Sequence, residues 1–334
     1  MRDNIRDYMI NFGYSNEMID KICNAHGVCT FTDETLFKKI KSINEFFISK
    51  GYSKNEIIRM TKQLPQIYCL SIEYIQQRME DLVLIGYTKQ DIKKMSVNLP
   101  LIYSYSLDNL KEKIEDMIKL GYDRLDILKM TKQTPSIFGN KIEKIKEKIQ
   151  NFLDCGYSIE TIIKITKNNS KLFSMAKENI QNKINDLLNL GYTKEEVLKM
   201  TTVLPTMFFY SIESIKEKIK LLISHGYTKE EVHDMTVLLP TLFCYSLEHI
   251  DAKINFYKSL NLDKMLCRFP MRLMQSIELT EARYNFYKSI NIEIDETNYN
   301  KLFVPQKRFI ESYSLTNQET INKYGKNIET KGLL

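Results

Sequence analysis

Tryptophan is absent from this chain of 334 residues, and glycine, proline and histidine are scarce, with 11, 7 and 4 copies. No apolar run approaches the roughly 18 residues of a membrane-spanning helix. The four histidines show no metalloprotease spacing, and the chain has no phosphate-binding loop, nucleophile elbow or glycine-rich dinucleotide turn. These absences remove the common catalytic and cofactor motifs. We therefore expect a protein that is not an enzyme and holds no cofactor, although paired carboxylates that bind Mg²⁺, as in nucleases, remain an alternative.

Cysteine is present but shows no framework spacing. The six residues are Cys23, Cys29, Cys69, Cys155, Cys244 and Cys267. Such scatter in a long chain is typical of reduced thiols rather than of a disulfide scaffold. The stretch CNAHGVC offers Cys23, His26 and Cys29 as metal ligands, but a structural zinc site needs a fourth, and none is evident nearby. We therefore expect no metal.

The charge balance is mildly basic, with a formal net charge of +6. This value permits a polyanionic partner without requiring one. The N-terminal stretch contains Asp3 and Asp7, unlike a secretory signal or an acid-poor transit peptide. We expect a cytoplasmic, monomeric protein; a protein imported into an organelle, with its presequence removed, would look the same.

A 35-residue repeat dominates the sequence. Gly-Tyr pairs recur in strict register at Gly51, Gly86, Gly121, Gly156, Gly191 and Gly226, while Gly13-Tyr14 precedes the series and Asn261-Leu262 continues it. Repetition at this period predicts an α-solenoid, because units of this size bury their apolar faces by stacking. We expect about eight repeats, starting near residues 13, 51, 86, 121, 156, 191, 226 and 261, in a curved superhelix of either hand.

Residues that start or end helices divide the repeat at Gly191 into three segments. The glycine suits the left-handed end of a helix, and Thr193 with Glu196 forms a capping box for a new helix, called helix A. Pro205 ends helix A and begins a short third segment that connects the two helices. Ser211 then caps a second helix, called helix B. One aromatic residue per turn is expected in the core between repeats: Tyr68, Tyr103, Phe138, Phe173, Phe208 and Phe243.

The repeat weakens in two places. Asn169-Ser170 replaces the Leu-Pro pair, and Ala176 replaces the capping serine. The register shortens after Asn261 and is lost from about Ile294. We therefore expect a repeat array over residues 1–293 and a C-terminal helical cap and tail over 294–334, with no linker between separate domains.

The segment GYTKEEVLKMTTVLPTMFFYS and the helix after it resemble the mTERF family, the mitochondrial transcription termination factors. The Leu-Pro pairs that carry the resemblance end at Pro65, Pro100, Pro205 and Pro240, and the likeness extends over roughly residues 13–315. It implies repeats of two helices and a 3₁₀ turn, and a nucleic-acid-binding superhelix that acts in gene expression. Duplex DNA is the expected partner and RNA the alternative; some plant relatives also cut DNA junctions. Pentatricopeptide repeats share the period, but the Gly-Tyr cap and the mid-repeat Leu-Pro do not fit them.

Two basic columns are candidates for nucleic-acid contacts. The first, the helix B column, lies beside the apolar stripe and comprises Arg78, Lys113, Lys148, Lys183, Lys218, Lys253 and Arg283. The second choice, the helix A column, comprises Arg59, Lys94, Lys129, Lys164 and Lys199, with Lys21 before them, and breaks at Asp234. Such columns suit a phosphate backbone, since stacked like charges otherwise repel.

Three questions stay open at this level. Lysines beside an apolar stripe also lie over it and reach solvent, and acids three residues later offer them local ion pairs. A column of phosphate contacts positions a nucleic acid without reading it, and Gln76, Gln77 and Asn182 are the candidates for base contacts. The alternative function is a protein–protein scaffold with a groove for a peptide or helix.

Overall fold

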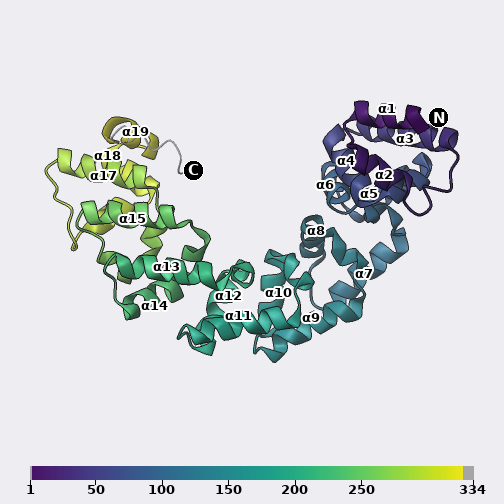
Figure 1. The fold of residues 1–334 in the computed structure, drawn as a ribbon. Coiled ribbons are helices and arrows are strands. Elements are labelled where there is room, and N and C mark those ends of the chain that lie inside the picture. The colour runs from purple at the N-terminus through teal and green to yellow at the C-terminus, as the bar shows by residue number, and fades with distance from the viewer. Residues whose placement is uncertain (1, 326–334) are drawn as a thin grey trace. The chain divides into compact units, whose positions relative to one another are not determined.

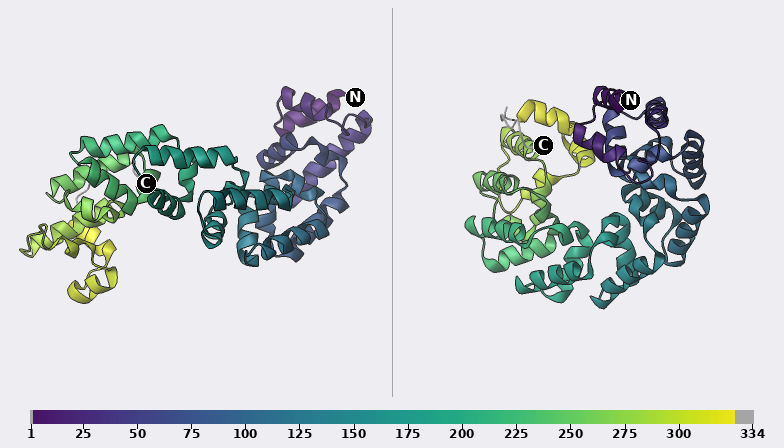
Figure 2. Two further views of the ribbon diagram at one scale, coloured as in Figure 1. Left: turned by 90° about the horizontal axis from the view of Figure 1, so that it is seen from below. Right: turned by 45° about the vertical axis from the view of Figure 1, so that its right-hand side comes forward.

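The computed structural model describes residues 2–325, and every regular element among them is a helix. Nineteen α-helices and eight 3₁₀ helices follow one another in that range, which confirms the expected all-α class (Figure 1). None of the described helices is long and apolar enough to span a bilayer. The two further views in Figure 2 show the same layered helices from other sides.

Each repeat consists of helix A, a 3₁₀ turn and helix B, except the first, where the segment 24–32 between helix A and helix B contains no 3₁₀ helix. The A helices are α2 (Asn16–Cys23), α4 (Lys54–Gln63), α6 (Lys89–Asn98), α8 (Arg124–Gln133), α10 (Ile159–Asn168), α12 (Lys194–Val203), α14 (Lys229–Leu238) and α16 (Met265–Arg268). The turns are η1 (Pro65–Cys69), η2 (Pro100–Ser104), η3 (Pro135–Gly139), η4 (Ser170–Ser174), η5 (Pro205–Phe209), η6 (Pro240–Cys244) and η7 (Pro270–Met274). The B helices are α3 (Asp33–Ser49), α5 (Ile72–Ile85), α7 (Leu107–Lys119), α9 (Ile142–Asp154), α11 (Lys177–Asn189), α13 (Ile212–Ser224), α15 (Leu247–Ser259) and α17 (Ile277–Ser289).

Glycine and the capping residues set the helix ends. Gly191 has φ +99°, a left-handed conformation that glycine adopts without strain, and Asn261 takes the same role later in the series with φ 55°. The Thr193 side chain accepts from the Glu196 backbone N–H, and the Glu196 carboxylate accepts from the Thr193 N–H at 2.8 Å. This capping box satisfies two of the free donors at the start of α12.

Proline places the 3₁₀ turns. In η5 and in every other repeat turn except η4, a proline stands at the first helical position, where its missing N–H costs nothing. The aromatic column lies in the core as predicted, because Tyr68, Tyr103, Phe138, Phe173, Phe208 and Phe243 are all buried.

In most repeats the tyrosine after the glycine joins consecutive repeats by a buried hydrogen bond between side chains. The Tyr122 hydroxyl lies 2.7 Å from Thr166 Oγ1 in the next helix A, and Tyr192 makes the same contact with Thr236 at 2.7 Å. Tyr87 pairs with Thr131, while Tyr52 reaches both Ser96 and Tyr103. The tyrosine therefore stabilises the stacking as well as the end of its own helix.

The chain divides into two compact units, the first ending at Lys177 and the second beginning at Glu178. The division falls beside the irregular repeat noted in the sequence. There the Ser170 hydroxyl lies where other repeats have proline, 2.8 Å from Thr134 Oγ1, which occupies the leucine position of the preceding repeat. In the second unit the helices α13, α15 and α17 stack one on the next (Figure 1).

The second unit ends in η8 (Tyr299–Phe303), α18 (Gln306–Tyr313) and α19 (Asn317–Tyr324). Phe286 of α17 packs edge-on against Phe309, Tyr313 and Tyr324. These aromatic contacts cover the last helix B. Residues 326–334 of the expected C-terminal cap and tail lie outside the described residues.

Candidate nucleic-acid interface

The structure places the helix B column at the junction between successive repeats. In the first unit Arg78, Lys113 and Lys148 are half-buried. In the second unit four members are buried, with exposed fractions from 9% down to 3%: Lys183, Lys218, Lys253 and Arg283.

Three of the buried side chains bind backbone carbonyl groups of the repeat that follows. Lys183 Nζ donates to the Tyr210 carbonyl at 2.6 Å, and Lys253 Nζ donates to the Gln275 carbonyl. Both carbonyls belong to the residue directly after a 3₁₀ turn, where an unsatisfied oxygen attracts a cation. Burial lowers the pKa of the Lys253 ammonium. Arg283 donates to the Leu302 and Val304 carbonyls and to Asn317 Oδ1. Lys218 donates to Ser214 of its own helix and lies 5.9 Å from the Tyr210 ring centre.

This placement differs from an open row of cations. The buried members are hydrogen-bonded to protein groups of their own unit, so direct contact with a phosphate would first require them to leave those partners. Arg78 is also engaged, in an ion pair with Asp81 at 3.0 Å. Lys113 and Lys148 have no hydrogen bond or ion pair to another described residue. Nucleic-acid contact by the helix B column stays a prediction, and these two lysines are its best placed members.

The helix A column is exposed throughout. Arg59, Lys94, Lys129 and Lys164 lie on the outer surfaces of α4, α6, α8 and α10 in the first unit, and Lys199 is exposed on α12 of the second. The four helices of the first unit pack in series, α4 on α6, α6 on α8 and α8 on α10. Packed helices are about 8–10 Å apart, so the helices that carry the four cations recur at about that spacing.

The acids near this row are bound to other cations. In the first unit each acid three residues before a column cation pairs with a lysine of the next helix A. The pairs are Glu56–Lys93 at 2.9 Å, Asp91–Lys132 at 3.6 Å and Asp126–Lys167 at 3.0 Å. None of the four column cations has an ion pair within residues 2–325. Their positive charge is therefore available to an external anion.

Carboxamides accompany the cations one helical turn later. Gln63, Asn98, Gln133 and Asn168 each follow a column cation by four residues, which places them on the same face of the helix. Arg59 Nη2 of α4 donates to Asn98 Oδ1 of α6 at 3.1 Å, so a cation of one helix contacts a carboxamide of the next. In the second unit Val203 and Leu238 take the carboxamide position, and Asp234 takes that of the cation. The polar, basic face thus belongs to the first unit.

The other carboxamide candidates have different surroundings. Gln76 donates to Glu80 at 3.1 Å and Gln77 donates to Asp81 at 3.1 Å, both within α5. Asn182 is exposed on α11. Alignment of the A helices, rather than of the B helices, would have revealed the carboxamide row in the sequence.

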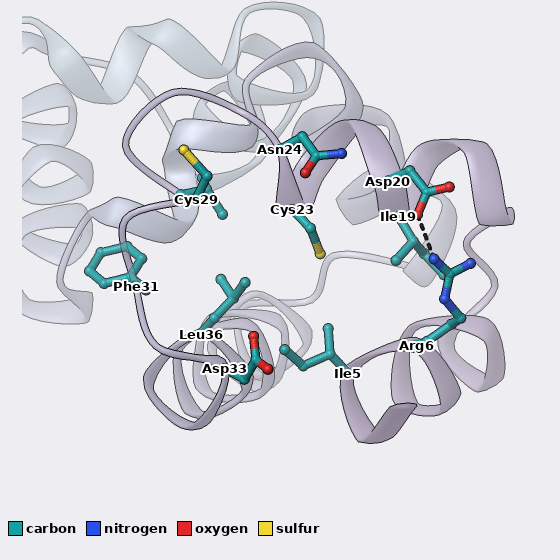
Figure 3. A pocket seen from close by; sticks show the side chains of 11 residues that line it. Ile5, Arg6, Ile19, Asp20, Cys23, Asn24, Cys29, Phe31, Asp33 and Leu36 are labelled. Carbon is teal, nitrogen blue, oxygen red and sulfur yellow. Dashed lines mark hydrogen bonds and ion pairs between the residues drawn. The ribbon is translucent and has the colours of Figure 1, made fainter. Parts of the chain in front are cut away.

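The cysteine-rich N-terminal segment lines a small pocket between α1 (Arg2–Phe12), α2 and α3. Figure 3 shows that the sulfur atoms of Cys23 and Cys29 point in different directions, and that Arg6 pairs with Asp20 at the other side. Nowhere in residues 2–325 do three side chains of His, Cys, Asp or Glu gather as metal ligands would.

Stacked pairs of helices joined by a 3₁₀ turn define a helical-repeat protein of the α-solenoid class. The family model of mTERF matches residues 6–119 and 114–250, the larger part of the chain. The chain belongs to the mTERF family, whose members are nucleic-acid-binding, transcription-related helical-repeat proteins. No curated protein matches the chain.

Proposed function

We propose that this protein binds duplex nucleic acid, DNA in preference to RNA, through the helix A face of its first unit, and that it regulates transcription or its termination. The observation that carries the proposal is the exposed row of Arg59, Lys94, Lys129 and Lys164, which has no acidic partner. Membership of the mTERF family supports the nucleic-acid partner. The protein acts as a monomer and without a catalytic step in this proposal.

The chemistry of the face fits both parts of nucleic-acid recognition. Lysine and arginine neutralise phosphates and release counterions, which provides affinity without sequence preference. The carboxamides Gln63, Asn98, Gln133 and Asn168 are of the type that hydrogen-bonds base edges, adenine above all. A duplex is favoured because a rigid row of short helices matches a regular backbone better than a flexible strand.

The test is binding measured by fluorescence anisotropy over a salt series, with duplex DNA, single-stranded DNA and RNA. The variant Arg59→Gln, Lys94→Gln, Lys129→Gln, Lys164→Gln removes the row. Its matched control removes four exposed lysines from the B helices: Lys41→Gln, Lys111→Gln, Lys144→Gln and Lys146→Gln. Each lost phosphate contact lowers the slope of log K against log salt by about 0.9 for a duplex.

We expect the row variant to lose a slope of up to about 3.6 on duplex DNA and the control to change little. A third variant, Lys113→Gln with Lys148→Gln, tests the accessible part of the helix B column by the same measurement. Equal losses in the row variant and the matched control would show that binding follows net charge and not this face, and would contradict the proposal.

A protein partner is the second candidate function, and one observation favours it. On the helix A face of the second unit, apolar side chains replace the carboxamides, and Val203 and Leu238 are each 54% exposed. Unpartnered apolar side chains are typical of protein interaction surfaces. The two functions are compatible, because they use different units.

A further inference from the structure

The last residue of each 3₁₀ turn lies on the surface, and its chemistry changes between the units. In the first unit the position holds the small residues Cys69, Ser104, Gly139 and Ser174. In the second unit it holds Phe209, Cys244 and Met274, and the side chains of Phe209 and Met274 are 47% and 46% exposed. Because the repeats share one backbone, the first unit shows that this position needs no large apolar side chain for folding.

Contacts between neighbouring turns join these positions into one strip. Tyr210 directly follows Phe209 in the chain, and its hydroxyl lies 3.5 Å from Cys244 Sγ. Thr241 Oγ1 of the same turn as Cys244 lies 3.7 Å from Met274 Sδ. Met271, 64% exposed, and Phe269 extend the apolar surface at the last turn. We call this set the turn strip: Phe209, Cys244, Phe269, Met271 and Met274.

A row of acids runs beside the turn strip. Glu213, Glu248 and Glu278 follow Phe209, Cys244 and Met274 by four residues each, in the first turns of α13, α15 and α17. All three are exposed, and none has an ion pair within the described residues.

Two of the cations near the acids are held by other groups, while Lys216, three residues after Glu213 on α13, is an exposed cation beside the acidic row. Lys253 donates to the Gln275 carbonyl, and the Arg272 guanidinium lies 4.0 Å from the Phe303 ring centre and donates to Asn300. Arg268, exposed beside Phe269, is a cation at the far end of the strip. The surface therefore combines an apolar strip with an acidic edge whose carboxylates make no ion pair within the described residues.

We propose that the turn strip and its acidic edge form the docking surface for a basic amphipathic helix of a protein partner. The apolar face of such a helix would cover the phenylalanine and methionine side chains, which adapt readily to a bound helix. Its lysines or arginines would pair with Glu213, Glu248 and Glu278. The acidic edge disfavours a phosphate backbone at this place, so the surface differs in kind from the helix A face of the first unit.

The probe is a synthetic helix of about five turns with leucine on one face and lysine on the other, labelled for anisotropy. A helix with glutamate in place of lysine is the matched control probe. Two variants of the full chain are compared with the wild type. The first variant, Phe209→Ser with Met274→Ser, places serine where the first unit has Ser104 and Ser174. The second, Glu213→Gln with Glu248→Gln and Glu278→Gln, removes the negative charge of the acidic edge.

We expect the lysine helix to bind the wild type, the glutamate helix to bind much more weakly, and each variant to lose about tenfold in affinity. The matched protein control, Asp108→Asn with Glu143→Gln, neutralises equivalent acids of the first unit and is expected to bind as the wild type does. Circular dichroism verifies that the variants are folded. If the serine variant does not fold, the charge variant still tests the proposal, because Glu213, Glu248 and Glu278 are exposed and their substitution does not disturb the core.

Four results would overturn the proposal. The lysine helix does not bind up to about 100 µM. The glutamate helix binds equally well. The turn-strip variants lose affinity for nucleic acid instead of for the helix. Or the wild type self-associates in sedimentation and the serine variant does not, which would assign the strip to a second copy of the chain. Salt-dependent duplex binding by the first unit is measured separately, so either proposal can fail alone.

Discussion

At the scale of single residues, polar groups inside the repeats decide how the stack is held together. The tyrosine–threonine pairs are hydrogen bonds between side chains buried among apolar neighbours, and their partners lie 44 positions apart in the sequence. A buried hydroxyl without a partner costs about 1–3 kcal/mol, whereas the bond itself contributes less. The pairs therefore penalise any misaligned stacking of repeats.

Thr166→Val tests this role. The substitution keeps the shape of the side chain but leaves the Tyr122 hydroxyl without its partner, so we expect the free energy of unfolding to fall by about 1–3 kcal/mol. Urea unfolding followed by circular dichroism measures the change. Thr202→Val is the control, because Thr202 is partly exposed and bonds only to the Leu198 carbonyl. Equal effects of the two substitutions would remove the tyrosine from the explanation.

The same tyrosines predict a fall in stability at alkaline pH. Burial raises the pKa of the phenols of Tyr14, Tyr52, Tyr87 and Tyr192, and raises the pKa of Tyr122 to about 12. A raised pKa in the folded state means that the contribution to stability is complete below the unfolded value of about 10 and is lost as the pH rises from there toward 12. We expect the urea midpoint to decline over this window, with phenolate absorbance appearing together with loss of helix. Tyr122→Phe should reduce the decline. Phenolate formation by these tyrosines in the fully helical protein would contradict the assignment.

At the scale of elements, the irregular repeat shows a compensated exchange. Thr134 and Ser170 replace leucine and proline of neighbouring repeats and bond to each other at 2.8 Å, and Ser170 also donates to the Met130 carbonyl. The backbone is unchanged, since Asn169 before η4 has φ −142° and ψ 80°, close to the −143° and 85° of Leu99 before η2. A proline therefore fits at position 170.

A double-mutant cycle of Thr134→Leu and Ser170→Pro measures the exchange. Each single substitution leaves one hydroxyl of the pair without its side-chain partner, while the double variant restores the leucine and proline of the other repeats. We expect the double variant to be more stable than the sum of the singles predicts, by about 0.5–3 kcal/mol in urea unfolding. Ser136→Leu, on an exposed residue, replaces Thr134→Leu in the control cycle and should be additive. Additivity in both cycles would show that the two replacements are independent.

Much of each element could be predicted from the sequence, because its determinants are local. Gly191, Thr193 with Glu196, and Pro205 mark helix ends through their own backbone preferences, and the structure confirms all three. The surroundings of Lys183 could not be predicted in this way. Helical periodicity places it beside the apolar stripe, but its burial depends on the Tyr210 carbonyl of the next repeat. Contacts between repeats are invisible to a pattern within one repeat.

At the scale of the whole molecule, the division into two units has a chemical counterpart. The first unit carries the exposed cations with carboxamides, and the second carries the turn strip with its acids. The 35-residue period continues unchanged across the division, from Gly51 to Asn261, so period alone does not show it. It becomes visible when equivalent positions are compared, for example Gln63 with Val203 or Ser104 with Phe209.

The second unit has a continuous core of its own, from Leu222 to Phe309. We expect a cavity made in this core to destabilise the helices around it and not the first unit. In a repeat protein, stability is the sum of repeats and their nearest-neighbour contacts, so a cavity acts mainly on its own neighbourhood. Met235→Ala, at a fully buried side chain of α14, should cost about 2–5 kcal/mol. Hydrogen exchange followed by mass spectrometry should then show faster exchange in α14 and α15, while α6 and α8 of the first unit keep their protection. The reciprocal variant Met95→Ala, at the equivalent position of α6, should show the opposite pattern. If either substitution accelerates exchange equally along the chain, the two units unfold together. The division into two units would then describe their contacts and not their stability.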